Sequence, residues 1–549
     1  MRPVPWHPKP IPTVWLDHKT GVGVDDSGAS VQPRIGGRRK YPNLADLLDT
    51  ALARGAQRLM LTGPVPDPVP GQDKHWLVVP TPQWTPLVHW LGTPPTGRFE
   101  HEVTHSRLEV RLAAEWFGTA TVTPAQARAA WAATADALRA SDRKAELFLS
   151  PAATGTNLWA LSLPRTIDPE PLPEDVAELL HRTAGQHRIE HLTTGPAACT
   201  CGGCRPLVDL AETPRGAFAY TDGRFMYASL CRELGTGPVT RLTGPQAAEL
   251  IERDPFCRAR FRVRFTVPDY WDHVGLLGVQ HENVRDGWHY PNVPGAGGEC
   301  WADAVEVRLA LDHGWTVEVL EGLSFAKGRV LDTWADRLVR ARRRAAEMPG
   351  LDLPVRRATQ AALRAILIQG IGAFASRGRE TTRVVWSARD VPAQYAHDVR
   401  RYGEAFVYRE PARGLSGNNA AYQRIELAAQ VWARGRARVL SCPSALSVKL
   451  SFGAWTTVGA LEVDPTTLLG INGDAIFTTS VEPWSLPTQY GGGDDGREGR
   501  LRLQGFLPDV KLPASAAERN KLREQAVAAG IDGALPHSPN ASEETTTGA

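Results

Sequence analysis

The sequence predicts a multidomain protein that combines α/β and α+β architecture. Three observations favour this class. The chain has 549 residues, short apolar runs alternate with helical periodicity in its first third, and longer helices and strands follow in the remainder. This length is sufficient for about three or four domains, each with a core of its own. With 42% hydrophobic and 22% charged residues, the composition is that of a folded protein and excludes a largely disordered one.

Residues 1–165 carry the alternating pattern, and we expect one α/β domain there. Short apolar runs predict buried strands, and two stretches with helical spacing predict helices, the second of them behind the capping pair Thr123-Pro124. The strands are expected at 58–62 and 76–80 and the helices at 43–53 and 125–138. The segment 164–174, rich in Pro, Asp and Glu, is typical of a linker and ends this domain.

From about residue 175 onward, we expect strands and longer helices that end in an unstructured tail. The strands are expected at 217–220, 258–265 and 316–320, the helices at 303–312, 330–347, 355–376 and 420–440, and an apolar hairpin at 467–478. Residues 536–549 are rich in Ser, Thr, Glu and Asn and show no periodicity, which predicts disorder.

The charge balance and the apolar segments exclude several classes of protein. The formal net charge is only +2, so any nucleic-acid-binding surface must be local rather than a uniform basic coat. No stretch approaches the roughly 18 apolar residues that a membrane span needs, and the first residues lack the apolar core of a signal peptide. We therefore expect a soluble, cytoplasmic protein with no membrane partner. Seven cysteines in a chain of this size do not indicate a disulfide scaffold.

Two aspartates stand in unusual surroundings. Asp222 ends an apolar strand, and Asp474 lies inside the apolar hairpin. A carboxylate is costly to desolvate there unless a positive charge compensates it. Two such aspartates brought together would bind hard divalent cations, because Mg²⁺ takes one or two carboxylates plus substrate phosphates, and a pair of ions about 4 Å apart serves phosphoryl or nucleotidyl transfer. The alternative is that Asp222 caps a helix and Asp474 is a turn residue.

Positive charge is concentrated between residues 323 and 380. This segment has twelve Lys and Arg against five Asp and Glu, a local net charge of +7. Arg357 and Arg364 share one helical face, which could bind a triphosphate or a nucleic-acid backbone through guanidinium contacts. Gly370 and Gly372 would leave room for a flat base, since each glycine costs a helix about 1 kcal/mol and needs a reason. The alternative is a solvated helix face.

Two further patterns allow a binding and a structural interpretation. Cys199, Cys201 and Cys204, with His187 or His191, could wrap a structural zinc ion, or they could be ordinary reduced cysteines. The arginines that alternate along 258–264 could present a basic face to a phosphate backbone, or they could protect an exposed sheet edge.

The order of three motifs resembles family B DNA polymerases, particularly their protein-primed bacteriophage branch, from about residue 188 to 480. The family's motifs are Asp-x-x-Ser-Leu-Tyr-Pro, Lys-x-x-x-Asn-Ser-x-Tyr-Gly and Tyr-x-Asp-Thr-Asp-Ser. They are matched in turn at 222–228, 364–372 and 470–475. The resemblance implies a palm, an antiparallel sheet with helices, that carries the first and third motifs, and helical fingers that carry the second.

The resemblance also implies roles for the matched residues. Asp222 and Asp474 would bind two Mg²⁺ ions, and Tyr227 would form the floor of the nucleotide pocket and exclude ribonucleotides. Arg364, with help from Arg356 or Arg357, would grip the triphosphate beside Gly372. Primer-template DNA and deoxynucleoside triphosphates are the implied partners, and a protein that supplies the priming hydroxyl is a further one.

The sequence departs from the family at several positions. Ile368 and Ile371 replace the Asn and Tyr of the second motif, Asn472 replaces the first Asp of the third, and Phe225-Met226 replaces the Ser-Leu of the first. The family's proofreading exonuclease begins with Asp-x-Glu, whereas the candidate strand here has Lys19 two residues after Asp17. We therefore expect the N-terminal domain to be exonuclease-like but inactive.

These observations combine into one interpretation with two alternatives. The domains are expected at 1–165 (degenerate exonuclease-like), 175–325 (first part of the palm), 326–380 (fingers), 381–535 (second part of the palm and a small thumb-like region) and 536–549 (tail). The expected function is template-directed DNA synthesis by a polymerase from a mobile element or a phage-like replication system. The alternatives are a catalytically decayed, nucleic-acid-binding relative and a zinc-stabilised interaction module.

Overall fold

The computed structural model divides the chain into two compact units. It describes residues 2–65, 75–92, 94–118, 121–167, 169–184, 190–193, 202–254, 256–280, 287–412, 414–441 and 458–535. The first unit combines residues 1–167 with 333–424, and the second combines 168–332 with 425–549. The expected ranges 326–380 and 381–535 therefore both straddle the division, and the predicted tail, 536–549, lies outside the described residues.

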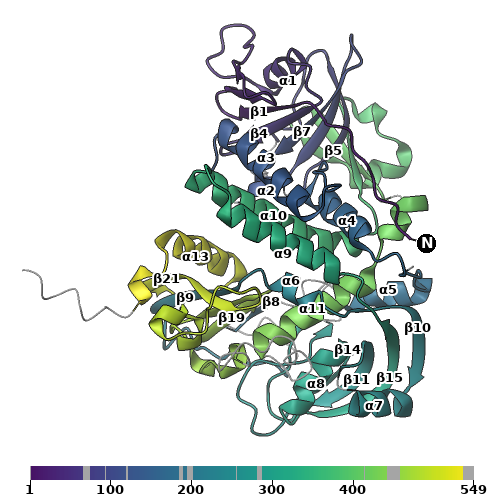
Figure 1. Ribbon diagram of the computed structural model, residues 1–549, viewed down its shortest axis with the longest axis vertical. Helices are drawn as coiled ribbons and strands as arrows, with labels where there is room; N and C mark the ends of the chain where they lie inside the picture. Colours follow the sequence, from purple (N-terminus) through teal and green to yellow (C-terminus); the bar gives the residue numbers. More distant parts are fainter. Residues whose placement is uncertain are drawn as a thin grey trace, which may run out of the picture. The chain divides into compact units, whose positions relative to one another are not determined.

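A ten-stranded mixed sheet forms the centre of the first unit (Figure 1). Its order is β17-β18-β16-β5-β6-β7-β4-β1-β2-β3, and the parallel pairs are β1–β4 and β4–β7. The strands are β1 (Thr13–Asp17), β2 (Gly23–Asp25), β3 (Ser30–Val31), β4 (Arg58–Thr62), β5 (Trp84–Trp90), β6 (Thr96–His101), β7 (Arg107–Leu112), β16 (Thr381–Val385), β17 (Arg400–Tyr402) and β18 (Ala405–Glu410).

The strand predicted at 58–62 is confirmed as β4, whereas the strand predicted at 76–80 is wrong. A single bridge joins His75 to Val78 in that stretch, and β5 begins at Trp84. Pro80 and Pro82 lie between the two. Because proline lacks the N–H that a ladder needs, the chain turns there before it enters the sheet.

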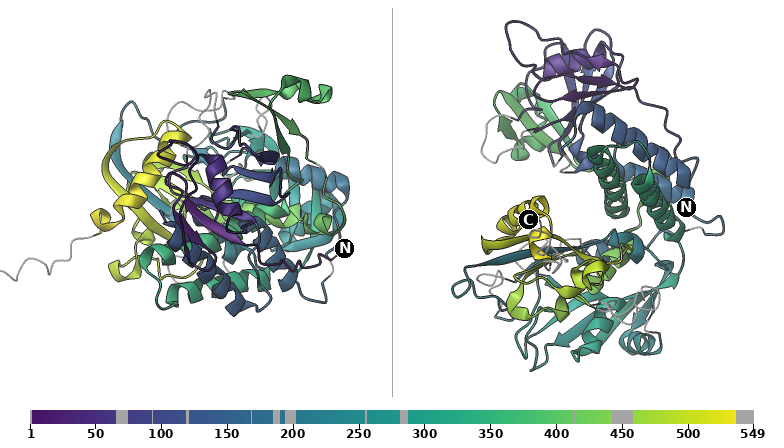
Figure 2. Two further views of the ribbon diagram at one scale, coloured as in Figure 1. Left: turned by 90° about the horizontal axis from the view of Figure 1, so that it is seen from above. Right: turned by 60° about the vertical axis from the view of Figure 1, so that its left-hand side comes forward.

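Helices pack against this sheet and against one another. They are α1 (Leu44–Leu52), α2 (Ala114–Phe117), α3 (Pro124–Ser141), α4 (Pro151–Ser162), α9 (Asp332–Glu347) and α10 (Leu353–Phe374). The helices predicted at 43–53 and 125–138 are confirmed as α1 and α3, and capping boxes at Asn43 and Thr123 start them. Helix α10 makes its most extensive helix contacts with α4, and Figure 2 shows the helices of 332–374 beside those of 124–162.

The crossing of α4 and α10 explains why α10 has a glycine at position 370, one of the two glycines expected to leave room for a base. Gly370 is buried, and a Cβ on it would lie 3.3 Å from the Cα of Gly155 on α4 and 3.1 Å from Trp334 on α9. The expectation that Gly370 leaves room for a base is therefore wrong, because it leaves room for another helix.

The second unit contains a five-stranded antiparallel sheet in the order β21-β9-β20-β19-β8 (Figure 1). Its strands are β8 (Glu190–Leu192), β9 (Arg215–Gly223), β19 (Leu468–Asn472), β20 (Ala475–Thr478) and β21 (Leu501–Lys511), and its helices are α6 (Met226–Leu230), α11 (Ile425–Leu440) and α13 (Ala516–Ala529). The core beneath α13 is aromatic: Phe218 and Tyr220 of β9 contact Phe477 of β20. The hairpin predicted at 467–478 is confirmed as β19–β20.

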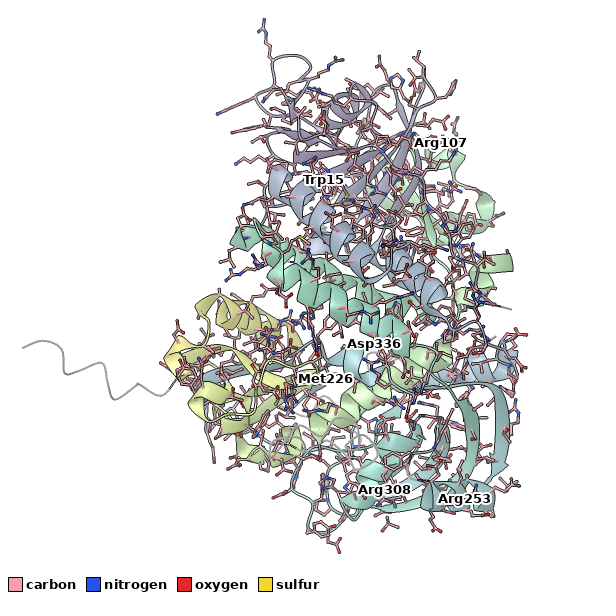
Figure 3. The ribbon with its side chains drawn as sticks, in the orientation of Figure 1. Trp15, Arg107, Met226, Arg253, Arg308 and Asp336 are labelled. Carbon is pink, nitrogen blue, oxygen red and sulfur yellow. The ribbon has the colours of Figure 1, made fainter. Side chains whose placement is uncertain are left out.

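A four-stranded antiparallel sheet, β10-β15-β11-β14, completes the second unit. Its strands are β10 (Gly235–Thr243), β11 (Ala259–Thr266), β14 (Gly297–Asp303) and β15 (Thr316–Lys327), accompanied by the ribbon β12 (Val279–Gln280) and β13 (Trp288–His289) and by α5 (Glu174–Thr183), α7 (Gly244–Arg253) and α8 (Ala304–Asp312). Figure 3 labels Arg253 at the end of α7 and Arg308 on α8.

Both interpretations of the arginine-rich strand are wrong. β11 lies between β15 and β14, so it is not an edge. Its exposed guanidiniums are neutralised across the strands, since Arg262 pairs with Glu299 and Glu321, and Arg264 pairs with Glu318. A face with this ion-pair pattern has no net positive charge to offer a phosphate backbone. Among the described residues, no helix is both long and apolar enough to cross a membrane.

Candidate functional site

The structure brings Asp222 and Asp474 together in the second unit. Asp222 lies near the end of β9, and the register of β9 with β20 places it opposite Ala475, the neighbour of Asp474. The Gly223 N–H donates to the Asp474 carbonyl at 3.0 Å. Both aspartates are buried, with 2% and 7% of their surface exposed. Two residues separated by about 250 positions in the sequence therefore lie at the same end of two neighbouring strands, β9 and β20.

Local backbone geometry fixes this arrangement. Asp474 and Gly473 form the two-residue connection of β19 and β20, and Gly473 has φ +64°, a left-handed conformation that glycine adopts without strain. Gly223 lies directly beneath the Asp474 carboxylate, because a Cβ built on Gly223 would be 2.9 Å from Asp474 Oδ2 and 2.6 Å from Met226 Cε. Met226, labelled in Figure 3, begins α6.

A clamp from residues 494–500 holds the turn that follows Asp222. Arg224 makes a bidentate ion pair with the buried Asp494 at 3.0 and 2.6 Å. The Arg224 N–H donates to the Arg500 carbonyl at 2.6 Å, and Gly499 N–H donates back to the Arg224 carbonyl at 2.8 Å. These contacts fix the turn that contains Phe225, whose φ of +47° is unusual for a residue with a side chain.

A second ion pair stabilises the clamp itself. Arg500 is buried and contacts both oxygens of Asp495 at 2.9 and 2.6 Å. The hydrogen bonds from Arg500 lower the pKa of Asp495 to about 2. The sequence did not predict a role for this segment. Its Gly- and Asp-rich run at 491–500 is typical of a loop, and only the alternation of acids with Arg497 and Arg500 could have indicated ion pairs.

Tyr227 lies on α6, close to Asp222 in sequence, and is buried. Its ring packs against α11, where a Cβ on Gly435 would lie 3.4 Å from Tyr227 Cε1. On the same helix, Arg434 donates to the Leu230 carbonyl at 3.0 Å and so supports the end of α6. The position of Tyr227 thus depends on a small residue and an anchoring arginine of α11.

The predicted triphosphate ligands lie on α10 of the first unit, whereas the aspartates and Tyr227 lie in the second. Arg357 and Arg364 are exposed, and Gly372 is exposed with open space where a Cβ would stand. Arg356 does not share this surface role, because its guanidinium donates to the carbonyls of Ala346 and Met348 and ties α10 to the end of α9.

Other cations of the basic segment are also engaged within the first unit. Arg337 pairs with Asp142 at 2.7 Å, and Arg379 lies 4.1 Å from the ring centroid of Trp90. The local net charge of +7 therefore overstates the positive surface that α9 and α10 can offer to an anion.

The described residues give the zinc interpretation no support. Cys199, Cys201 and His187 lie outside them, and Cys204 is partly exposed. In the part of the chain that the structure describes, no three His, Cys, Asp or Glu side chains gather around a point that could hold a metal ion. The donor set at the aspartate pair is thus two carboxylates, which suits a cation that completes its coordination with substrate oxygens and water.

In the N-terminal domain, Asp17 stabilises a turn. Its Oδ1 accepts from the Thr20 N–H at 2.8 Å and from the Thr20 hydroxyl at 2.9 Å, and Lys19 is exposed within the same turn. The carboxylate that would begin an exonuclease motif thus forms hydrogen bonds within the turn that connects β1 and β2.

The fold is similar to solved structures of phi29 DNA polymerase. The ternary complex with primer-template DNA and incoming nucleotide matches with a TM-score of 0.51 and 8% identity, over 91% of this chain and 86% of that one. The post-translocation binary complex with primer-template DNA matches with a TM-score of 0.50 and 10% identity, over 91% and 85%. No family model and no curated protein matches the sequence. The chain is therefore a mixed α/β multidomain protein with a polymerase-like fold.

Proposed function

We propose that this protein is a template-directed DNA polymerase of the family B type, from a mobile element or a phage-like replication system. The observation that carries the proposal is that Asp222 and Asp474, both buried, lie at the same end of the neighbouring strands β9 and β20. The similarity in fold to a DNA polymerase supports it.

Asp222 and Asp474 are the residues proposed to bind divalent cations, with two Mg²⁺ ions as the expected occupants. They fit this role because each offers carboxylate oxygens in a site where an uncompensated negative charge is costly. When bound, the cations supply positive charge to the transferred phosphoryl group and to the attacking hydroxyl. The protein's own contribution is a fixed geometry, since the hairpin turn and the 494–500 clamp hold the two carboxylates before any substrate arrives.

Tyr227 and the exposed face of α10 are the proposed nucleotide-binding elements. Tyr227 would form the floor beneath the sugar, because α11 fixes its ring. Arg364 and Arg357 are exposed on one face of α10 and are proposed to bind the triphosphate, with the open surface at Gly372 two turns further along the helix. Primer-template DNA and deoxynucleoside triphosphates are the proposed partners, and a protein primer is a further one.

The substitution Asp474→Asn tests this proposal. We expect D474N and D222N to abolish Mg²⁺-dependent extension of a primed template, while affinity for the same DNA, measured across a salt titration, stays near that of the wild type. The control is Asp509→Asn, because Asp509 is an exposed aspartate on β21 that pairs with Arg215. Extension by D474N at the wild-type rate would refute the proposal.

One set of observations favours the alternative of a catalytically decayed, nucleic-acid-binding relative. Asn472 lies where the family has an acid, Ile368 and Ile371 replace the polar residues of the second motif, and an amide already contacts Asp222. A wild-type protein that binds primer-template DNA with a steep salt dependence but extends no primer would favour this alternative.

A further inference from the structure

Gln504 of β21 reaches the Asp222 carboxylate from a β-bulge. In the pairing of β21 with β9, Leu503 lies opposite Thr221 and Gly505 lies opposite Tyr220, so Gln504 is the extra residue. A bulge redirects a side chain out of the regular alternation of a strand. Helix α13 packs against this point, since a Cβ on Gly505 would collide with the Ala526 carbonyl. Packing against α13 therefore holds the bulge in place.

The contact joins a neutral donor to a buried anion. Gln504 Nε2 donates to Asp222 Oδ2 at 2.6 Å, and Asp222 is only 2% exposed. Hydrogen bonds to a charged acceptor are short and roughly twice as strong as neutral ones. The amide therefore restrains the orientation of the carboxylate and occupies one lone pair of Oδ2.

We propose that Gln504 is a positioning residue that limits how tightly the Asp222–Asp474 pair binds a divalent cation. This inference rests on the proposed function, because it presupposes that the pair binds cations. A cation that approaches Asp222 Oδ2 must share this oxygen with the Gln504 amide or displace the amide from it. Weak, substrate-dependent binding follows, in which substrate oxygens complete the coordination.

Two variants at this position separate the proposed role from a structural one. Gln504→Met keeps the length of the side chain and removes the amide, so we expect Mn²⁺ to bind about tenfold more tightly, the equivalent of one hydrogen bond to a charged group. Gln504→Glu adds a third carboxylate beside Asp222. We expect at least the same gain and a melting temperature that rises more steeply with Mn²⁺ concentration than in the wild type.

The measurement is a Mn²⁺ titration of the full chain followed by electron paramagnetic resonance, in which bound Mn²⁺ loses its free-ion signal. Gln280→Glu is the matched control, because Gln280 is an exposed glutamine on β12 and adds the same charge at a distance. Unchanged Mn²⁺ affinity in both Gln504 variants, with binding lost in D222N, would overturn this inference alone. Mn²⁺ binding by D222N equal to that of the wild type would instead overturn the proposed cation site.

Discussion

The crossing of α4 and α10 makes Gly155→Ala a sharp test of the first unit. Gly155 lies where the two helices approach most closely: a Cβ there would be 2.5 Å from the Ile366 carbonyl oxygen and 2.9 Å from the Gly370 Cα. Both neighbours are backbone atoms of a helix, so neither can move aside as a side chain would. The helices would have to separate by about 1 Å to restore ordinary van der Waals contact.

The expected loss of stability in Gly155→Ala combines two destabilising contributions with one stabilising contribution. Overpacking a close contact costs about 1–3 kcal/mol, and a shift of α4 weakens the 2.8 Å hydrogen bond from Trp334 Nε1 to the Gly155 carbonyl, which contributes about 1 kcal/mol. The higher helix propensity of alanine offsets about 1 kcal/mol. We therefore expect the free energy of unfolding to fall by about 2 kcal/mol and the melting temperature by about 4–8 °C.

Gly372→Ala on α10 is the matched control. Nothing lies within 4 Å of the position of its Cβ, so only the propensity gain remains and the melting temperature should rise slightly. Thermal and urea denaturation, followed by circular dichroism, measure both variants. A Gly155→Ala protein as stable as the wild type would refute the packing argument. A Gly372→Ala protein that is more stable but binds nucleotide less well would support the proposed role of Gly372.

Two further predictions concern the clamp and a buried histidine. Asp494→Ala leaves Arg224 without its ion-pair partner in a mostly buried position, so we expect a loss of about 3 kcal/mol in urea unfolding. Asp509→Ala, which breaks an exposed Arg–Asp pair, should cost less than about 1 kcal/mol, and equal losses would contradict the argument. Burial lowers the pKa of His89 to about 4. As the pH falls, His89 is therefore protonated in the unfolded chain before it is protonated in the folded protein. Protonation thus favours unfolding, and about 3 kcal/mol of stability present above pH 6.5 should be lost as the pH falls toward 4. His89→Gln should flatten that dependence in urea titrations at pH 7.5 and 4.5, and an unchanged slope would exclude His89 as its source.

Local patterns predicted individual elements well. The capping boxes at Asn43 and Thr123 depend on residues three apart, and both helices begin where the sequence indicates. The hairpin that carries Asp474 was also predictable, because a glycine turn between two apolar runs favours it regardless of the rest of the chain.

Properties that depend on a distant partner were not predictable in the same way. The arginines of β11 are neutralised by glutamates on β14 and β15, up to 59 positions away, and only the strand order reveals them. The periodicity of α10 identifies an apolar face, but it does not say that Gly155 of another helix occupies it. The same holds for Gln504: Gly505 inside β21 is a sign of a bulge, but it does not say that the neighbouring Gln504 reaches Asp222.

The meeting of the two aspartates depends on a register that aromatic packing sets. Tyr220 lies opposite Phe477, with ring centroids 5.4 Å apart and planes inclined by 12°. A slip of one residue would turn every side chain of β20 to the other face, bury polar groups and break this stack. Because Asp222 lies two residues beyond Tyr220, the register that stacks the rings is the one that brings Asp222 beside Asp474. The hydrophobic core thus determines the geometry of the proposed cation site, and substitutions at Phe477 should disturb cation binding as well as stability.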